Sequence, residues 1–431
     1  MTQNNQMLVN EKQIPESFKN TEIGMIPRSW KLEKLKNVTS VIIDGTHFTP
    51  TYISYGIPFL RVTDIHGALF TSEFKYISST EHQSLIKRCK PKKGDLLLSK
   101  NGTIGIPKVV TWDWEFSIFV SLALIRPKNS FLDVNFLYQF FKSNFLDLQL
   151  SQRAKQGTVV NLHLEEIREL LIPLPVIEEQ EKIATALSDT DALISELEKL
   201  IEKKQSIKTA TMQQLLTGKT RLPEFALRED GTPKGYKDSE LGQISEDWEL
   251  LSFSEVCTFI NGRAYGLHEW EKRGTPVIRL QNLTGRGEDY YYSTLNLPAK
   301  QYCDYGDLLF MWSATFGPVI WKGQKAIYHY HIWKIVCNEK VDKDFLYLTL
   351  EDMTENLKRG SSSGGTMLHV TKEIMESTLA IFPPHAEQLR IASVLNGIIQ
   401  EIELLVEKLN KLKNIKQGMM QELLTGKTRL V

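Results

Sequence analysis

The chain has 431 residues, which corresponds to two or three domains of ordinary size. Its 52 Lys and Arg residues balance 52 Asp and Glu residues, and 42% apolar residues suffice for sizeable cores. This composition excludes disordered, collagen-like and disulfide-stapled proteins. The four cysteines form no CxxC pair, which excludes a zinc ribbon and indicates a reducing compartment.

No segment has the composition of a membrane span or a targeting signal. The longest apolar run, residues 118–125, is interrupted by Ser121 and is far shorter than the roughly 20 residues of a span. The polar N-terminus resembles neither a secretory signal nor a transit peptide. We therefore expect a soluble protein of a bacterial-type cytoplasm, without a membrane partner.

The neutral charge balance hides a difference between two segments. Residues 21–172 hold 19 basic and 14 acidic residues, a net +5, whereas residues 239–382 hold 14 and 19, a net −5. Global charge therefore gives no support for nucleic-acid binding. A local cluster is compatible with either a phosphate contact or a solvated loop: Lys87, Arg88, Lys90, Lys92 and Lys93.

The chain is an internal duplication. Residues 212–222 recur at 420–430 with a single change, Gln214 to Glu422. The offset between the copies is 208 there, 212 where 94–97 match 306–309, and 218 where 56–61 match 274–279. Flanks that repeat closely around interiors that gain and lose residues indicate one scaffold carrying two different surfaces.

Each copy ends in a predicted long helix of about 39 residues. Apolar residues step alternately by 3 and 4, which is a heptad seam that requires a facing helix. The seam positions are Ile183, Leu187, Thr190, Ile194, Leu197 and Ile201, and then Ile391, Leu395, Ile398, Ile402, Leu405, Leu409 and Leu412. Gly218 and Gly426 are well placed as C-caps. We favour an intramolecular antiparallel pair, because one chain carries both helices.

The globular parts mix short apolar runs with Gly, Pro and Asp turns, which indicates two compact mixed α/β domains. Each also contains a helical stretch, near 135–150 and 344–357. The fold class is thus α+β: two mixed α/β domains related by duplication and separated by two long helices that form an antiparallel coiled coil.

The catalytic and metal motifs fail on inspection. Thr217-Gly-Lys-Thr220 resembles the end of a P-loop, but Gln213 stands where a Gly is required and the helix precedes the motif. His329 and His331 would share one face of a strand, which could begin a metal site, but no third ligand lies nearby in sequence, so a structural pair is favoured. A chain of this size without a catalytic constellation is expected to be a binding component.

Gly-rich polar loops are the candidate binding elements. Gly lets the backbone approach a surface closely, and Ser, Thr, Asn and Arg reach phosphates and base edges. The loops are 44–50 and 101–105 in the first copy, and 261–266, 313–317 and 359–366 in the second. Any one of them alone is compatible with an ordinary turn, but their recurrence favours a binding face.

The chain resembles the specificity (S, HsdS) subunit of type I restriction-modification systems over nearly its whole length. The resemblance rests on Glu240-Leu-Gly-Gln-Ile-Ser-Glu-Asp-Trp248 and its first copy at 22–30, on Gly94-Asp-Leu-Leu-Leu-Ser-Lys-Asn-Gly102 and on Ile172-Pro-Leu-Pro-Val-Ile-Glu-Glu-Gln180. It also rests on the twice-used Leu-Leu-Thr-Gly-Lys-Thr-Arg-Leu. The second Pro-Glu-Gln segment, 382–388, departs from the pattern.

The resemblance implies a non-catalytic subunit with two target-recognition domains, each reading half of a bipartite, asymmetric site on double-stranded DNA. The paired helices would set the spacer between the halves. It also implies two methyltransferase (M) subunits and endonuclease/translocase (R) subunits as partners. S-adenosylmethionine, ATP and Mg²⁺ would belong to those partners, with no cofactor or metal in this chain.

The boundaries that we expect follow the repeat. They are an N-terminal tail (1–20), target-recognition domain 1 (21–176), long helix 1 (177–217), a linker (218–238), target-recognition domain 2 (239–384), long helix 2 (385–425) and a C-terminal tail (426–431).

The candidate DNA-binding residues are polar, cationic or aromatic side chains of the loops. In the first domain they are Thr46, His47, Lys100, Asn101, Thr103, Arg153, Lys155 and Gln156, and in the second Arg263, Tyr265, Ser313, Thr315, Arg359, Ser361 and Ser362. Arg61 and Arg279 occupy equivalent positions, where a shared phosphate contact or a structural ion pair is expected rather than base reading.

Two alternatives remain open from the sequence. The first is a coiled-coil scaffold without a DNA role, which the acidic second domain favours slightly. The second is a self-sufficient methyltransferase or nuclease, which the missing motifs disfavour. Sequence-dependent DNA binding in the presence of partners discriminates against the scaffold, and activity of the isolated chain would be needed to support the second alternative.

Overall fold

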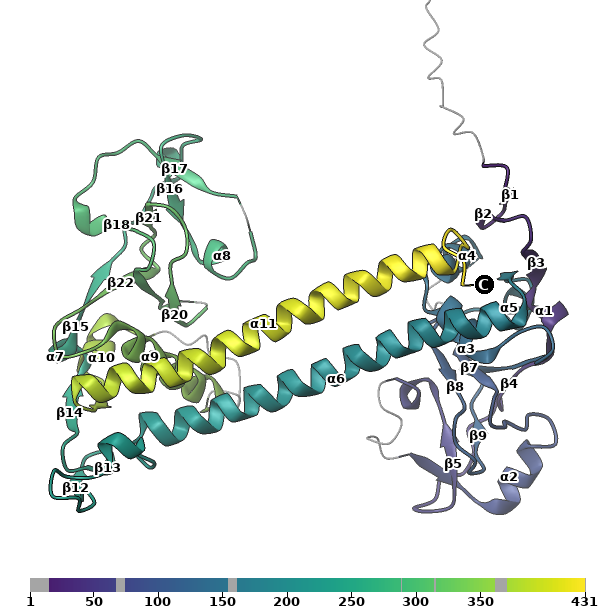
Figure 1. Ribbon diagram of the computed structural model, residues 1–431, viewed down its shortest axis with the longest axis horizontal. Coiled ribbons are helices and arrows are strands. Elements are labelled where there is room, and N and C mark those ends of the chain that lie inside the picture. The colour runs from purple at the N-terminus through teal and green to yellow at the C-terminus, as the bar shows by residue number, and fades with distance from the viewer. Residues whose placement is uncertain are drawn as a thin grey trace, which may run out of the picture. The chain divides into compact units, whose positions relative to one another are not determined.

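The structure is a computed structural model that describes residues 15–66, 74–153, 161–287, 289–313, 315–360 and 370–430. It divides into two compact units, one formed by Met1–Glu198 with Glu407–Val431 and the other by Lys199–Val406. We call the part of the first unit that precedes the long helices the first domain. The part of the second unit between the long helices is the second domain (Figure 1).

The first domain is built from small, mainly antiparallel sheets. Its central sheet has the order β4-β10-β7-β8, formed by Thr39–Asp44, Leu122–Pro127, Leu96–Ser99 and Pro107–Val109. A second sheet, β6-β5-β9, joins Lys75–Ile77, Ile57–Leu60 and Ser117–Ile118, with β5 and β9 parallel. The two-stranded sheets are β1-β2 (Phe18–Thr21, Gly24–Pro27) and β3-β11 (Lys31–Lys34, Leu171–Leu174).

Short helices surround these sheets. They are α1 (Leu35–Val38), η1 (Val62–Asp64), α2 (Ser79–Leu85), α3 (Val134–Phe141), α4 (Asn144–Arg153) and α5 (Leu164–Arg168). The single helical stretch expected near 135–150 is two helices. The Ser143 hydroxyl donates a 2.6 Å hydrogen bond to the carbonyl of Phe140, which offers the backbone a turn in place of helix.

The second domain repeats this order of elements. Its sheets are β15-β22-β19-β20 (Cys257–Asn261, Ile332–Cys337, Leu308–Met311, Gly317–Ile320) and β17-β16-β21-β18 (Tyr291–Ser293, Thr275–Ile278, Ala326–Tyr328, Tyr302–Cys303). The pairs are β12-β13 (Tyr236–Ser239, Gly242–Ser245) and β14-β23 (Glu249–Ser252, Leu379–Phe382). Helices are η2 (Pro223–Phe225), α7 (Phe253–Val256), η3 (Leu267–Glu269), α8 (Leu280–Leu283), η4 (Ala299–Gln301), α9 (Lys343–Gly360) and α10 (Lys372–Ser377).

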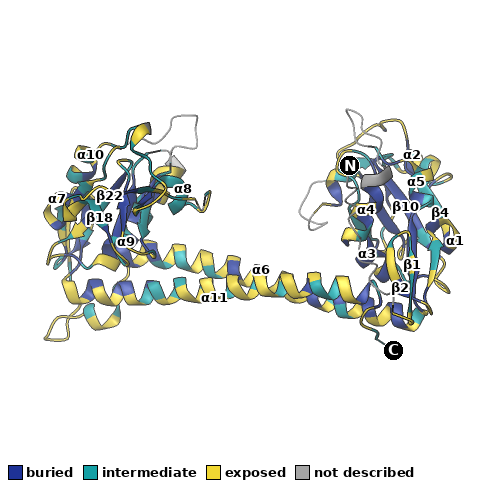
Figure 2. Ribbon diagram, turned by 90° about the horizontal axis from the view of Figure 1, so that it is seen from above, coloured by how far each residue is buried: buried dark blue, intermediate teal, exposed yellow. Residues whose placement is uncertain are grey.

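The two long helices are α6 (Ile177–Leu216) and α11 (His385–Leu423), and they pack together as the heptad seams predict. Within the first unit the beginning of α6 lies beside the end of α11, where Lys416 forms a 2.5 Å ion pair with Asp191. Within the second unit Lys204 pairs with Glu401 at 2.7 Å. The helices are therefore antiparallel. Figure 2 shows their buried residues gathered where they meet the domains.

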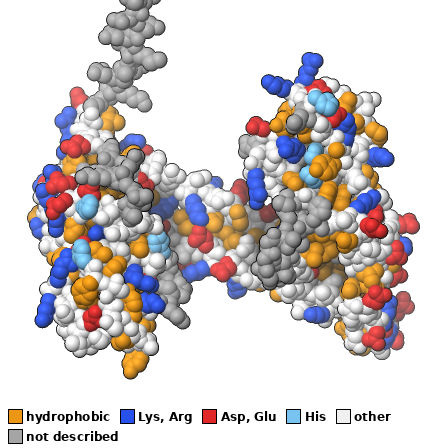
Figure 3. Space-filling view, turned by 180° about the vertical axis from the view of Figure 1, so that it is seen from behind, with side chains coloured by type: hydrophobic (Ala, Val, Ile, Leu, Met, Phe, Trp, Pro, Cys, Tyr) orange, Lys and Arg blue, Asp and Glu red, His pale blue; other side chains and the backbone are white. Residues whose placement is uncertain are grey.

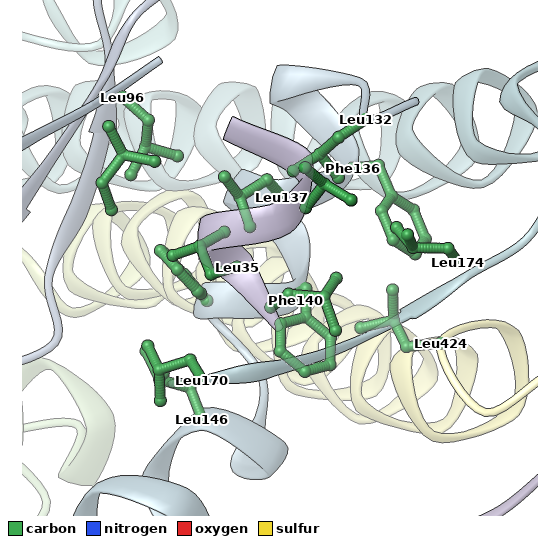
Figure 4. Packing of buried hydrophobic residues seen from close by; sticks show 14 of the residues in the cluster. Leu35, Leu96, Leu132, Phe136, Leu137, Phe140, Leu146, Leu170, Leu174 and Leu424 are labelled. Carbon is green, nitrogen blue, oxygen red and sulfur yellow. The ribbon is translucent and has the colours of Figure 1, made fainter. Parts of the chain in front are cut away.

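Both long helices complete the core of each domain. In the first, Ile183 and Leu187 of α6 and Leu424, which follows α11, join Phe136 and Phe140 of α3 in one cluster (Figure 4). In the second, Met212 and Leu216 at the end of α6 join Ile391 and Leu395 at the start of α11. Neither domain can bury its core without helix segments from both copies of the repeat.

The repeated Leu-Leu-Thr-Gly-Lys-Thr-Arg motif has a structural role. Gly218 and Gly426 follow the helices with φ of +69° and +68°, as expected of C-caps. Each turn carries an arginine to the carboxylate in the first turn of the other long helix. Arg221 binds Glu387 at 2.6 Å and Arg429 binds Glu179 at 2.7 Å. The motif thus ties the end of each copy to the domain of the other.

The Pro-Glu-Gln segments also act alike in both copies, although the second departs from the pattern. Gln180 donates to the carbonyls of Phe131 and Pro175, both at 3.0 Å. Gln388 donates to the carbonyls of Lys340 and Pro383, both at 2.9 Å. A buried glutamine therefore holds each helix against the loop before α3 or α9.

Candidate DNA interface

In each domain three loops meet where strands of the central sheet begin or end, and we call this place the loop junction. In the first domain it comprises 44–48, 100–103 and 119–121, and in the second 261–265, 312–313 with 315, and 329–331. The backbone bonds correspond. Val120 N donates to Thr46 O at 2.9 Å and Lys100 N to Ser121 O at 2.9 Å. In the second copy Tyr330 N donates to Arg263 O at 3.1 Å and Trp312 N to His331 O at 3.2 Å.

A glycine opens each junction because the backbones approach closely there. A Cβ added to Gly45 would lie 1.9 Å from the carbonyl oxygen of Ile118, and one added to Gly262 would lie 2.2 Å from that of His329. Both distances are sterically excluded, so only glycine fits. The two junctions therefore have the same backbone arrangement and differ in their side chains.

Charged side chains organise the first junction. Asp44 is 3% exposed, and its carboxylate contacts Arg88 at 2.7 Å, His47 at 3.2 Å and Lys100 at 3.3 Å. Burial raises the pKa of Asp44, but the hydrogen bonds from Arg88 and His47 and the charge of Lys100 outweigh it and lower the pKa overall. The carboxylate is thus ionised and fully paired.

The predicted residues of the first domain are partly gathered here. Thr46, His47, Lys100, Asn101 and Thr103 lie at the junction. Thr46 is 8% and Lys100 5% exposed, whereas the side chain of His47 is 65% exposed although it contacts Asp44. Asn101 pairs with Asn161 in a β-bridge, and Thr103 is exposed in the following turn. Arg153 ends α4 with its side chain outside the described part, and Lys155 and Gln156 lie outside the described residues.

Aromatic side chains organise the second junction. Tyr265 stacks on Trp270 with centroids 5.0 Å apart, and the Arg263 guanidinium lies 4.3 Å from the Tyr265 ring while paired with Glu269. Trp312 packs on His331, with centroids 5.4 Å apart, and donates its indole N–H to the carbonyl of Tyr330 at 2.8 Å.

Two polar atoms of this ring cluster are shielded from solvent without a hydrogen-bond partner: Nη1 of Arg263 and the hydroxyl of Tyr265. Buried polar groups are normally paired, so these are candidates for pairing with a ligand. Of the other predictions, Ser313 and Thr315 form the β19–β20 turn, and Arg359 lies in the last turn of α9 with its side chain undescribed. Ser361 and Ser362 lie outside the described residues.

The structure also places the predicted histidine pair and the two equivalent arginines of the repeat. His329 and His331 lie in the turn between β21 and β22 and not on a strand, so the strand assignment was wrong; the close glycine contact holds this turn in place. Arg61 forms an ion pair with the buried Asp64 at 3.0 Å, which is the structural alternative. Its counterpart Arg279 instead lies over the Trp270 and Tyr291 rings, at 5.6 and 5.4 Å.

Sequence reasoning missed the residues that organise both junctions. Asp44 opens the first loop, and Arg88 of the basic cluster binds it although the Arg88 side chain is 49% exposed, while Lys93 of the same cluster pairs with Asp113 at 3.0 Å. Trp312 occupies the position of Lys100, which the offset of 212 would have indicated. Among the described residues no cluster of three or more His, Cys, Asp or Glu could hold a metal, and no helix is long and apolar enough to cross a membrane.

Comparison with known proteins defines the class. A sequence model of the family described as the type I restriction modification DNA specificity domain matches residues 27–209 and again 245–414. The chain therefore belongs to the type I restriction-modification DNA specificity family and is a specificity subunit with two such domains. It is the non-catalytic component of the type I restriction enzyme complex.

Individual relatives agree over the full length. A protein of Methanocaldococcus jannaschii named "Putative type I restriction enzyme MjaX specificity subunit" is 29% identical over 428 residues, 96% of this chain and 97% of its own. The MjaVIII specificity subunit of the same organism is 24% identical over 442 residues, 97% and 94%. The crystal structure of the type I S subunit from M. genitalium shares the fold, with a TM-score of 0.57, 15% identity and coverage of 91% and 96%.

Proposed function

We propose that this specificity subunit reads a bipartite, asymmetric site on double-stranded DNA, with each loop junction contacting one half. The observation that carries this proposal is the pair of loop junctions, which have one backbone arrangement but unlike side chains: a charge cluster around Asp44 in the first and aromatic rings around Tyr265 and Trp312 in the second. Cations and hydroxyls donate to base edges and phosphates, whereas rings contact thymine methyl groups and base faces. Two unlike reading surfaces suit two unlike half-sites.

The long helices set the spacing between the half-sites in this proposal. A helix of 40 residues such as α6 runs about 60 Å at 1.5 Å per residue, which is ample to separate half-sites about one DNA turn, or ~34 Å, apart. Lysine and arginine side chains are interspersed with acidic ones on the face seen in Figure 3, so specific loop contacts carry more of the recognition than net charge.

The partners follow from the same proposal. Two methyltransferase (M) subunits and the endonuclease/translocase (R) subunits bind this chain and act at the site that it selects. S-adenosylmethionine, ATP and Mg²⁺ serve those subunits, and this chain contributes no cofactor-binding residue. Because the substrate is cellular DNA, the complex acts in the cytoplasm.

The test is binding by the chain with its methyltransferase subunits to duplexes in which one half-site at a time is altered. Trp312→Ala should relax discrimination at one half-site only, by about tenfold, because one base contact is worth roughly 1–3 kcal/mol. Tyr236→Ala is the matched control: this tyrosine is 56% exposed in β12, away from the loop junction, and its loss should change neither half. Equal binding of all duplexes by the unmodified chain would reject the proposal.

A further inference from the structure

One buried carboxylate joins three separate segments of the first domain. Asp44 is the last residue of β4, Arg88 follows α2, and Lys100 follows β7. Arg88 binds the carboxylate through Nη2 at 2.7 Å, and its Nη1 donates to the carbonyls of Asp44 at 3.1 Å and Gly45 at 2.7 Å. The planar guanidinium thus fixes both the side chain and the backbone at the start of the 44–50 loop.

The same contacts shape an open cavity of about 330 Å³ beside that loop. His47 and Phe48 line it from the loop and Arg88 lines it from the opposite segment. The side chains of His47 and Phe48 are 65% and 59% exposed, so the domain core does not hold them in place. Their position depends on the backbone that Arg88 and Asp44 hold.

The second domain shows that the scaffold does not need this arrangement. Asn261 pairs with Trp333 as Asp44 pairs with Ala123, so Asn261 stands in the place of Asp44. Trp312 stands in the place of the buried Lys100. The same sheet order forms there, with the loop held by the Arg263–Glu269 pair. A buried charge cluster that the fold can dispense with indicates a role in the loops that it joins.

We propose that Asp44, with Arg88, is a positioning residue that fixes the reading loops of the first domain and so sets discrimination at the half-site that this domain reads. The proposal rests on the proposed function above. It assigns Asp44 no contact with DNA, because its carboxylate is buried and already in contact with Arg88, Lys100 and the His47 ring. The loss of Asp44 therefore acts on sequence preference through His47, Phe48 and the loop backbone.

The test uses the full chain with its methyltransferase subunits and two variants of the cluster. Asp44→Asn alone would leave Lys100 buried and unpaired, so it is combined with Lys100→Met, which removes that charge at similar length. Arg88→Lys keeps the positive charge but cannot bind the carboxylate and the two carbonyls at once. It tests the proposal by itself if the double variant does not fold. Asp113→Asn is the control, since Asp113 is a 78% exposed carboxylate that pairs with Lys93 at 3.0 Å.

The readout is the ratio of binding to matched and singly mismatched duplexes, measured separately for each half-site. Both cluster variants should lose about tenfold in this ratio at one half-site, with unchanged discrimination at the half-site that Trp312→Ala relaxes. Circular dichroism and the unfolding midpoint of the folded variants should match the control. A merely stabilising role would lower the midpoint and leave the ratios as they are.

Two results would overturn the proposal: preserved discrimination at both half-sites in Arg88→Lys and in the double variant, or an equal loss at both. The failure of the proposed function is distinguishable from either, because the unmodified chain would then show no preference at any half-site.

Discussion

The indole N–H of Trp248 donates a hydrogen bond to Glu387, in the first turn of α11, at 3.1 Å, and Trp30 does the same to Glu179 of α6 at 3.2 Å. In each case an arginine from the end of the other copy of the repeat binds the same carboxylate and lies over the indole ring. The guanidinium of Arg221 is 5.5 Å from the Trp248 ring and that of Arg429 is 5.7 Å from the Trp30 ring. Each long helix therefore begins at a three-residue clamp that closes only when the other copy has folded.

Removing the better buried arginine should cost more stability. Arg221 is 7% exposed and binds both Glu387 and Asp247, whereas Arg429 is 32% exposed. We expect Arg221→Ala to lower the free energy of unfolding by about 3–5 kcal/mol, because it leaves Glu387 buried without its partner. Arg429→Ala should cost less. Urea unfolding measures both, and Arg228→Ala is the control, whose effect should be far smaller because its pair with Glu246 is exposed to solvent.

Two glycines should respond to alanine with opposite signs. Gly426 has a φ of +68°, and a Cβ there would lie 2.4 Å from Pro27, so Gly426→Ala should destabilise the first unit by more than about 1 kcal/mol. Gly397 lies within α11 with open space around it, so Gly397→Ala should stabilise by roughly 0.5–1 kcal/mol. Thermal unfolding distinguishes them, and a stabilising Gly426→Ala would contradict the C-cap role.

Deleting one heptad from both long helices should change the spacer of the recognised site. Removing 199–205 and 402–408 retains the seam and shortens the pair by roughly 10.5 Å, or about three base pairs. Methylation of a library of spacer lengths by the chain with its methyltransferase subunits gives the readout. An unchanged preferred spacer would contradict the ruler role, and deletion in one helix alone is the control that should disrupt pairing.

Acid should weaken the second domain through His329. Burial, followed by the charges of His331 and Arg279, lowers its pKa to about 4, from about 6.5 when unfolded. Because the unfolded chain binds the proton more tightly, this residue reduces stability as the pH falls from about 6.5 to 4 and contributes nothing above that window. The difference in urea midpoint between wild type and His329→Asn should therefore change with pH inside the window and be constant above it.

The sequence predicts the repeating architecture well because periodic and repeated features are local. The heptad steps from Ile183 to Ile201 and the offset of 208 require no tertiary information to detect. The cap glycines were likewise predictable from their place after each helix. The resemblance of the repeated motifs to the specificity family is confirmed by the family match in both copies.

The binding residues are less predictable from the sequence, because tertiary packing determines which loop side chains are buried and which are accessible. Lys100 reads as an exposed loop cation, yet it is 5% exposed and paired with Asp44, a contact that spans 56 residues of sequence. The ring cluster of the second domain combines Tyr265 and Trp270, from the connection between β15 and β16, with Tyr291 of β17, and no spacing rule connects these two segments. Which loop residues contact DNA stays a prediction for both domains.

The most direct test is a genome-wide map of methylated bases in cells that express the cognate methyltransferase subunit with and without this chain. A methylated motif split into two unlike halves, present only when the chain is expressed, is the predicted result, and it would define both half-sites. An identical methylation map in the two cells, with the methyltransferase shown to be active, would contradict the role of this chain in DNA specificity.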